Sequence, residues 1–179
     1  MQISFRARIM LGFALEVVAI ISGILSYPNL IFILSFVVLP AAIGIILLVD
    51  TFTAHRKERD DFRGKVIHEA LAILDRMAWS TQYFDVSYSV WSGKAEEFKA
   101  ELLGGEDYKL WKAFYDSIEA RNIFFRSRES YAWQDLEKLN QSCFDSFIKI
   151  HDEIPWVNQS IARTDLDNLL SKARKHGMI

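Results

Sequence analysis

The sequence lacks paired cysteines, a strong net charge and a catalytic motif. Its 179 residues include a single cysteine, Cys143, which cannot form an internal disulfide and fits a reducing compartment. Taken alone, Cys143 is typical of a small buried hydrophobe. The net charge is −2, and the residues after position 49 comprise 19 basic and 22 acidic side chains. This mildly acidic balance opposes binding to duplex nucleic acid, although a few arginines could still hold a small anionic ligand.

Catalytic and metal-binding patterns are missing as well. His68-Glu69 lacks the second histidine of a zinc-protease helix, and His151-Asp152-Glu153 is an isolated polar group at the end of an expected helix. Trp91-Ser92-Gly93-Lys94 lacks the first glycine and the spacing of a phosphate-binding loop. Nothing in the sequence pairs Cys143 with a base. We therefore expect no enzyme, no cofactor and no metal site.

What the sequence does have is two long apolar runs near its start. Residues 9–27 carry one charge, Glu16, and residues 30–49 carry none. As a helix, the first run would rise about 28 Å, close to the hydrocarbon thickness of a bilayer. The break Tyr27-Pro28-Asn29 is typical of a turn, and the second run directly after it opposes a cleaved signal peptide. The sequence predicts a transmembrane helical hairpin over residues 1–50.

Basic residues predict how this hairpin is oriented. Arg6 and Arg8 precede the first run, and five basic residues follow the second run between positions 56 and 65. The connecting turn has none. By the positive-inside rule both termini lie in the cytoplasm, which predicts a multi-pass protein of the inner (plasma) membrane.

Glu16 is the one carboxylate inside the apolar runs, and a charge at that depth in lipid is costly and typical of a functional group. Gly12, Ala19 and Gly23 share its helical face at spacings of three or four residues, and small side chains let helix backbones approach. This face is the predicted interface for membrane assembly or for lining a pore. In an antiparallel hairpin we expect Glu16 to lie level with residues 40–42, which offer room but no counter-charge.

Three states of Glu16 stay open at this point. The carboxyl could carry a proton, bond to a hydroxyl or to a polar group of another copy, or face a water-filled lumen. The last two options favour more than one copy of the chain. Pro40 removes a backbone hydrogen bond and is predicted to kink the second span near the level of Glu16, as a hinge for opening. A tolerated proline without a gating role is the alternative.

The rest of the chain is typical of amphipathic helices. Residues 51–66 mix basic and acidic side chains and are expected to form a juxtamembrane stalk. Residues 67–179 show apolar side chains at helical spacing in four to five segments. Only residues 84–91 alternate weakly, as a strand would. The predicted fold is all-α, with an N-terminal transmembrane hairpin followed by a cytoplasmic helical bundle that acts as a sensor or interaction domain.

Two aromatic clusters lie in this second part. Arginine forks hold phosphates and aromatic faces stack nucleobases, so one cluster is the candidate site for a nucleotide-like ligand: Arg121, Arg126, Arg128, Tyr131 and Trp133. Core aromatics flanked by solvated arginines would give the same pattern. The other cluster is expected in the core: Trp79, Tyr83, Phe84, Tyr88 and Trp91.

Three classes of function fit these features. The chain could be a membrane effector whose cytoplasmic bundle senses a ligand and whose hairpins assemble to open the bilayer. It could be a membrane-anchored scaffold or accessory subunit that recruits a protein partner. It could also be a small transporter or channel whose soluble domain only sets the oligomer size. A scaffold explains the bundle equally well but gives Glu16 no role.

In layout, two N-terminal spans followed by a compact cytosolic sensor, the chain resembles prokaryotic two-span anti-phage membrane effectors. It is most similar to the membrane effectors of type III CRISPR defence, which bind cyclic oligoadenylate in the cytosolic domain. Retron-associated two-span effectors are a close alternative. The resemblance concerns architecture across the whole chain rather than a shared motif. It implies a homo-oligomer, a tetramer to match a fourfold ligand, and growth arrest by membrane disruption.

Overall fold

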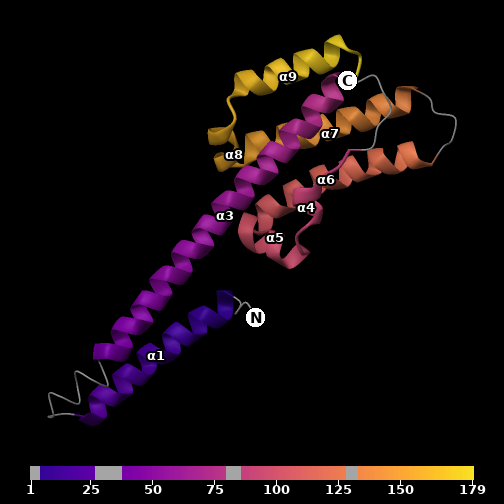
Figure 1. Cartoon of the computed structure of the whole chain (residues 1–179). Helices are drawn as coiled ribbons and strands as arrows, with labels where there is room; N and C mark the ends of the chain where they lie inside the picture. The colour runs from indigo at the N-terminus through magenta and orange to yellow at the C-terminus, as the bar shows by residue number, and fades with distance from the viewer. Residues whose placement is uncertain (1–4, 27–37, 80–85, 128–132) are drawn as a thin grey trace. The chain divides into compact units, whose positions relative to one another are not determined.

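The computed structural model describes residues 5–26, 38–79, 86–127 and 133–179, except for the side chains of residues 5–8, 23–26 and 133. Every regular element within these ranges is a helix, which confirms the all-helical prediction for them. Figure 1 shows the helices: α1 (Phe5–Ser26), α3 (Leu39–Trp79), α4 (Ser89–Ser92), α5 (Glu96–Leu103), α6 (Gly105–Arg126), α7 (Trp133–Glu153), α8 (Pro155–Ser160) and α9 (Arg163–Lys175).

The chain divides into two compact units, Met1–Asp60 and Asp61–Ile179. Helix α3 belongs to both, because it begins in the first unit and ends in the second. The division falls within the stalk predicted at residues 51–66. The predicted domain limits themselves stay predictions.

In the first unit, α1 packs antiparallel against the first half of α3. A Cβ atom at Gly12 would lie 2.7 Å from Leu48, and a Cβ atom at Gly44 would lie 2.8 Å from Glu16 Oε1. Residue numbers that rise along α1 are therefore matched by numbers that fall along α3. Both glycines are buried, because the two helices approach more closely than a side chain at either position would allow. We call this contact the seam; it comprises Gly12, Glu16, Ala19, Gly44 and Leu48.

In the first unit the described surface of residues 9–49 is apolar, whereas residues 50–60 of α3 carry exposed charged side chains. Large hydrophobic side chains point away from the seam on both helices, for example Met10, which is 73% exposed, and Ile46, which is 65% exposed. Helix α3 is long and apolar enough to cross a membrane, and only 11% of its most apolar stretch is buried within the chain. In α1, residues 9–22 form a shorter apolar stretch. Length and composition thus make α3 a candidate membrane span.

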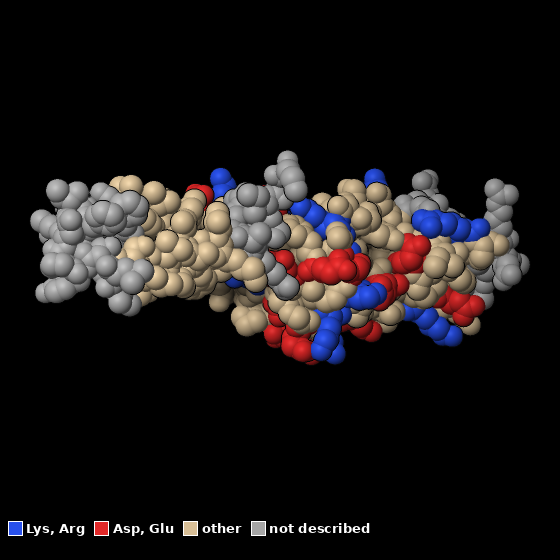
Figure 2. Space-filling view, turned by 90° about the horizontal axis from the view of Figure 1, so that it is seen from below, with Lys and Arg blue, Asp and Glu red and all other residues tan. Residues whose placement is uncertain are grey.

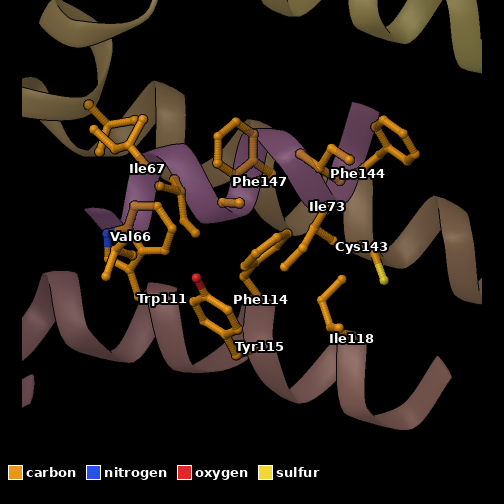
Figure 3. Packing of buried hydrophobic residues seen from close by; sticks show 14 of the residues in the cluster. Val66, Ile67, Ile73, Trp111, Phe114, Tyr115, Ile118, Cys143, Phe144 and Phe147 are labelled. Carbon is orange, nitrogen blue, oxygen red and sulfur yellow. The ribbon is translucent and has the colours of Figure 1, made fainter. Parts of the chain in front are cut away.

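The second unit has an aromatic core between α3, α6 and α7. Figure 3 shows Val66, Ile67 and Ile73 of α3 facing Trp111, Phe114, Tyr115 and Ile118 of α6 and Cys143, Phe144 and Phe147 of α7. Every one of these side chains is buried. The stripes that the sequence predicts for these helices account for this packing, since residues spaced by three or four share one helical face.

Two polar contacts hold the irregular parts of the second unit. The buried amide of Asn122 on α6 accepts a hydrogen bond from Val86 N at 3.0 Å and donates one to Val86 O at 2.9 Å. Gly104 joins α5 to α6 with a φ of 93°, a left-handed conformation that favours glycine. Arg63 of α3 donates to the carbonyl of Leu103 at 3.1 Å, which ties this turn to α3.

Two expectations about aromatic and strand-like segments need correction. Trp79 does not lie in the core: its side chain is 59% exposed at the end of α3, and the ammonium group of Lys172 lies 3.7 Å from its ring centroid. Trp91 is buried as expected and Tyr88 partly so, while Tyr83 and Phe84 lie outside the described residues. The described part of the weakly alternating segment, from Val86 onward, contains no strand and ends in α4.

Candidate functional site

The Glu16 carboxylate lies in the seam, against the backbone of α3. Its Oε1 atom is buried and has no hydrogen-bond partner among the described residues. The position that a Gly44 Cβ would occupy lies 2.8 Å from this oxygen and 3.3 Å from the carbonyl oxygen of Gly12. An unpaired buried acceptor costs about 1–3 kcal/mol. The seam therefore contains one polar atom that folding of the described chain leaves unsatisfied.

The register of the seam differs from the expected one. Glu16 lies at Gly44 rather than at the level of Pro40, Ala41 and Ala42. Gly44 is the only glycine in the first half of α3, and only a residue without Cβ leaves room for a carboxylate directly on the helix backbone. The same register accounts for the Gly12–Leu48 contact one turn further along.

The small-residue face predicted for membrane assembly is used within the chain. Gly12 is buried against Leu48, and Ala19 is 1% exposed. Gly23 lies in α1, but its surroundings are outside the described part. Pro40 lies in the first turn of α3, and the residues that precede it by four positions are not described, so the predicted kink stays a prediction. A contact between copies through this face stays a prediction as well.

The arginine–aromatic cluster is only partly described. Arg121 is 3% exposed, donates from Nε to Asn140 Oδ1 at 2.8 Å, and holds its guanidinium 4.5 Å from the Phe125 ring centroid. Arg126 is exposed, with Nη1 3.4 Å from Glu119 Oε1. Arg128 and Tyr131 lie outside the described residues, as does the side chain of Trp133. The structure thus places Arg121 in the α6–α7 contact and Arg126 on the surface.

Sequence reasoning missed the role of Glu69 on α3. Its Oε1 atom accepts a hydrogen bond from Val90 N at 2.7 Å, and its Oε2 atom accepts bonds from Trp91 N at 3.1 Å and from the Tyr115 hydroxyl at 2.9 Å. Burial, together with the Glu69 charge, raises the pKa of Tyr115 well above its ordinary value. No local signal reveals this site, because its donors lie 21, 22 and 46 residues away.

A cationic contact lies beside this network. The Lys99 side chain is nearly buried; its ammonium pairs with Glu96 at 2.7 Å and lies 4.3 Å from the Trp91 ring centroid. Trp91 in turn stacks on Tyr115 with ring centroids 4.4 Å apart. The Lys99 and Tyr108 hydrogen bonds lower the pKa of Glu96, and the same Glu96 bond raises the pKa of Tyr108 to about 12. These groups satisfy one another, so this network reads as structural support.

The two remaining candidate residues, Cys143 and His151, are buried side chains of the second unit. Cys143 is fully buried, and burial raises the pKa of its thiol to about 11, which makes it a poor nucleophile. His151 is buried and contacts Asp152 Oδ1 at 3.0 Å and the Ile161 carbonyl at 3.2 Å. Among the described residues, no three His, Cys, Asp or Glu side chains come together as a metal site.

Within the part of the chain that the structure describes, every regular element is a helix, and one of these helices, α3, is long and apolar enough to cross a membrane. Comparison with protein-family models, with curated proteins and with solved structures found no match.

Proposed function

We propose that this chain is a ligand-controlled membrane effector of prokaryotic anti-phage defence. Its first unit spans the bilayer as a two-helix hairpin with both termini in the cytoplasm, and copies of it assemble to disrupt or open the membrane. Its second unit senses the ligand, which is a cyclic oligonucleotide in the type III CRISPR effectors that the chain resembles in layout. The apolar surface of the first unit supports the proposed membrane insertion. The unsatisfied oxygen of Glu16 supports the proposed effector activity.

The contrast between the two surfaces supports membrane insertion. On the face that Figure 2 shows, Lys, Arg, Asp and Glu are interspersed over the second unit, whereas the described residues of the first unit carry few of them. The exposed large hydrophobic side chains lie mostly in the first unit, and Trp79 and Ile123 are the only two in the described part of the second. Apolar patches of this extent on a helix pair are covered in the functional state, and lipid is the cover that suits helices apolar on all sides.

The unsatisfied oxygen of Glu16 supports a role beyond anchoring. An anchor needs only apolar helices, and a leucine at position 16 would serve it without an unpaired buried acceptor. A buried carboxyl oxygen that the described residues leave without a partner suits a group that meets water or another copy when the membrane is opened. Effector activity is therefore the function in which Glu16 has a task.

The effector part is tested by induced expression of the full chain in a bacterial host. Growth and entry of a membrane-impermeant dye are measured for wild type, Glu16→Leu and a control, Val17→Leu, which alters the adjacent exposed apolar residue. We expect growth arrest and dye entry with wild type and with the control, and the loss of both with Glu16→Leu. Arrest by Glu16→Leu equal to wild type would refute the proposal.

The ligand part is tested by binding of cyclic and linear oligonucleotides to the full chain in detergent. Arg126→Ala should weaken binding by roughly 1.5–3 kcal/mol, the contribution of one charged hydrogen bond. Lys112→Ala is the matched control, because Lys112 is an exposed, carboxylate-paired cation on the same helix. Equal affinities of both variants would remove Arg126 from the ligand site, and no binding of any nucleotide would remove this ligand class.

A membrane-anchored scaffold is the second candidate, favoured by the outward face of α7. An open depression of about 610 Å³ lies along this face, lined by polar and mixed-charge side chains such as Glu137, Lys138, Gln141 and Asp145. Such a surface suits a polar protein partner better than a polyanion. If the chain is a scaffold, Glu16→Leu has no effect and the phenotype depends on the presence of the partner.

A further inference from the structure

Within the first unit, the seam determines which parts of α1 and α3 lie at the same level. Glu16 lies at Gly44 and Gly12 lies at Leu48, so a step of four residues back along α1 matches a step of four residues forward along α3. Continued by one more step, this register places the first turn of α1 level with residues 52–55 of α3.

This register brings basic residues of the two helices to one level. Arg6 and Arg8 lie in the first turn of α1, and Arg56 and Lys57 directly follow the part of α3 that is level with this turn. We call these four residues the collar. The short stretches of α1 and α3 that contain the collar include a single acidic residue, Asp50. The collar therefore has an excess of positive charge, although the whole chain has a net charge of −2.

The collar borders the exposed apolar surface of the same two helices. On α3, the last exposed large hydrophobic side chains of the first unit are Val49 and Phe52, and Arg56 follows Phe52 by one helical turn, or about 6 Å of rise. On α1, the exposed Met10 follows Arg8 by two residues. Lysine and arginine side chains at such a border lay their alkyl parts on apolar surface and keep their charged ends in the polar layer.

The two collar cations on α3 are available to an anion. The Arg56 side chain is 78% exposed, and its Nε atom lies 3.9 Å from Asp60 Oδ2. The same carboxylate lies 3.7 Å from Arg59 Nε, so one acidic group serves two guanidinium groups. Exposed ion pairs of this kind contribute little. Lys57 is exposed and has no ion-pair partner among the described residues.

A phosphate group attached to a lipid fits this position better than a free phosphate. Basic residues beside a membrane-facing surface attract anionic headgroups, and the acyl chains of the same lipid cover the adjacent apolar side chains. A free phosphate would leave these apolar side chains exposed to water. Position and charge together therefore favour an anionic phospholipid as the occupant.

We infer that the collar binds the headgroups of anionic phospholipids in the cytoplasmic leaflet. This inference rests on the membrane location and orientation given under the proposed function. It adds to that function the class of lipid that the first unit recognises, and it makes the headgroup phosphates the feature that sets how deeply the helix pair is inserted.

Spin-labelled lipids test the inference on the full chain in phosphatidylcholine vesicles. Electron paramagnetic resonance measures the fraction of labelled lipid whose motion the protein restricts, first with spin-labelled phosphatidylglycerol and then with spin-labelled phosphatidylcholine. The ratio of the two fractions reports the preference for an anionic headgroup. The variants are Lys57→Gln and the double variant Arg56→Gln/Lys57→Gln. Lys65→Gln is the matched control, because Lys65 is an exposed cation of the same helix that is paired with Asp61 at 2.6 Å.

We expect wild type to prefer phosphatidylglycerol by about threefold at low salt, with a smaller preference as salt is added. Lys57→Gln should reduce this preference, the double variant should reduce it further, and Lys65→Gln should keep it. Equal restriction of both lipids by wild type, or equal losses in Lys57→Gln and Lys65→Gln, would overturn the inference. Loss of the preference when inorganic phosphate replaces chloride at constant ionic strength would assign the collar to a free phosphate and overturn it as well.

The same spectra separate this inference from the proposed function. Restricted lipid without a preference for phosphatidylglycerol contradicts the headgroup site and leaves the membrane proposal intact. The absence of restricted lipid with either label contradicts both.

Discussion

Two glutamates, one in each unit, occupy opposite surroundings. Glu69 accepts three hydrogen bonds inside the second unit, two from the backbone around α4 and one from Tyr115. Glu16 has a buried oxygen with no partner among the described residues. The carboxylate that the chain satisfies holds distant segments together, whereas the one left unsatisfied costs stability. The difference teaches that a residue which breaks the packing rules within its own unit is the better candidate for function.

The largest expected effect comes from replacing Glu69, the glutamate whose carboxylate accepts three hydrogen bonds. Glu69→Leu leaves the N–H groups of Val90 and Trp91 and the Tyr115 hydroxyl without their acceptor, and we expect a loss of about 3–5 kcal/mol in the free energy of unfolding of the second unit. Denaturant titration of the full chain in detergent measures it by tryptophan fluorescence, because all five tryptophans lie after residue 60.

Glu69→Gln is the control for this prediction. It keeps the shape and one acceptor oxygen, so it should cost less than half as much as Glu69→Leu. Equal stabilities of Glu69→Leu and wild type would show that the three hydrogen bonds do not support the fold.

A second change tests whether other polar contacts of the second unit are equally structural. Asn122→Leu leaves the N–H and C=O groups of Val86 unpaired, and we expect a loss of about 2–3 kcal/mol. Asn168→Leu, at an exposed position of α9, should change stability by less than about 0.5 kcal/mol. The same fluorescence titration decides, and similar losses for both variants would contradict the assignment.

Some features of both units could be predicted from the sequence. Helical periodicity alone places Phe114, Ile118, Cys143, Phe147 and Ile150 in the core, and all five are buried. Apolar composition likewise marks α3 as a candidate span. Both signals are local, so they are readable from one sequence.

The rest depends on contacts between distant residues. The donors that satisfy Glu69 are set by how α3, α4 and α6 pack, and the burial of Arg121 depends on Asn140 from the next helix. Trp79 is exposed although its pattern fits a core, because α3 ends at this residue. The sequence predicts that Glu16 lies on the small-residue face of α1, but its predicted level, at residues 40–42, was wrong. Glu16 lies at Gly44, the one glycine in the first half of α3, because only a residue without Cβ leaves room for a carboxylate there.

The seam is tested by a double-mutant cycle on Glu16 and Gly44. Gly44→Ala introduces a Cβ atom 2.8 Å from Glu16 Oε1, so we expect it to destabilise the helix pair by about 1 kcal/mol in the presence of Glu16 and by less in Glu16→Ala. The stability of the helix pair is measured by titration with dodecyl sulfate. A loss of helicity without a change in tryptophan fluorescence reports unfolding of the first unit, because all five tryptophans lie after residue 60.

Gly64→Ala is the matched control in the same helix, because nothing lies within 4 Å of its Cβ position. We expect it to be neutral or stabilising by about 0.5–1 kcal/mol, from helix propensity alone. Additive effects of Gly44→Ala and Glu16→Ala would contradict direct contact in the seam.

The smallest expected effect is a pH dependence of the second unit. Burial raises the pKa of the Cys143 thiol from its ordinary 9.0 to about 11. The folded state then keeps a proton that the unfolded state loses, so this stabilisation is complete below pH 9 and is lost as the pH rises through 11. At pH 10 the loss relative to pH 8 is about 1 kcal/mol, and the raised pKa of Tyr115 acts in the same direction at higher pH.

Unfolding titrations at pH 8 and pH 10 are carried out on wild type and on Cys143→Ala. The thiol contribution is the amount by which the free energy of unfolding falls further in wild type than in the variant between these two pH values. Identical pH dependence of both proteins would exclude it. In native protein at pH 8, a thiol reagent should modify Cys143 only at the rate at which the second unit opens.

The account is tested most directly by placing the same substitution at both glutamates and measuring stability and membrane permeability together. We predict that Glu69→Leu loses several kcal/mol of unfolding free energy. Glu16→Leu should keep the fluorescence-detected stability of wild type, yet abolish dye entry on induced expression. Dye entry with Glu16→Leu equal to wild type would contradict the claim that the unsatisfied carboxyl in the seam is the functional one.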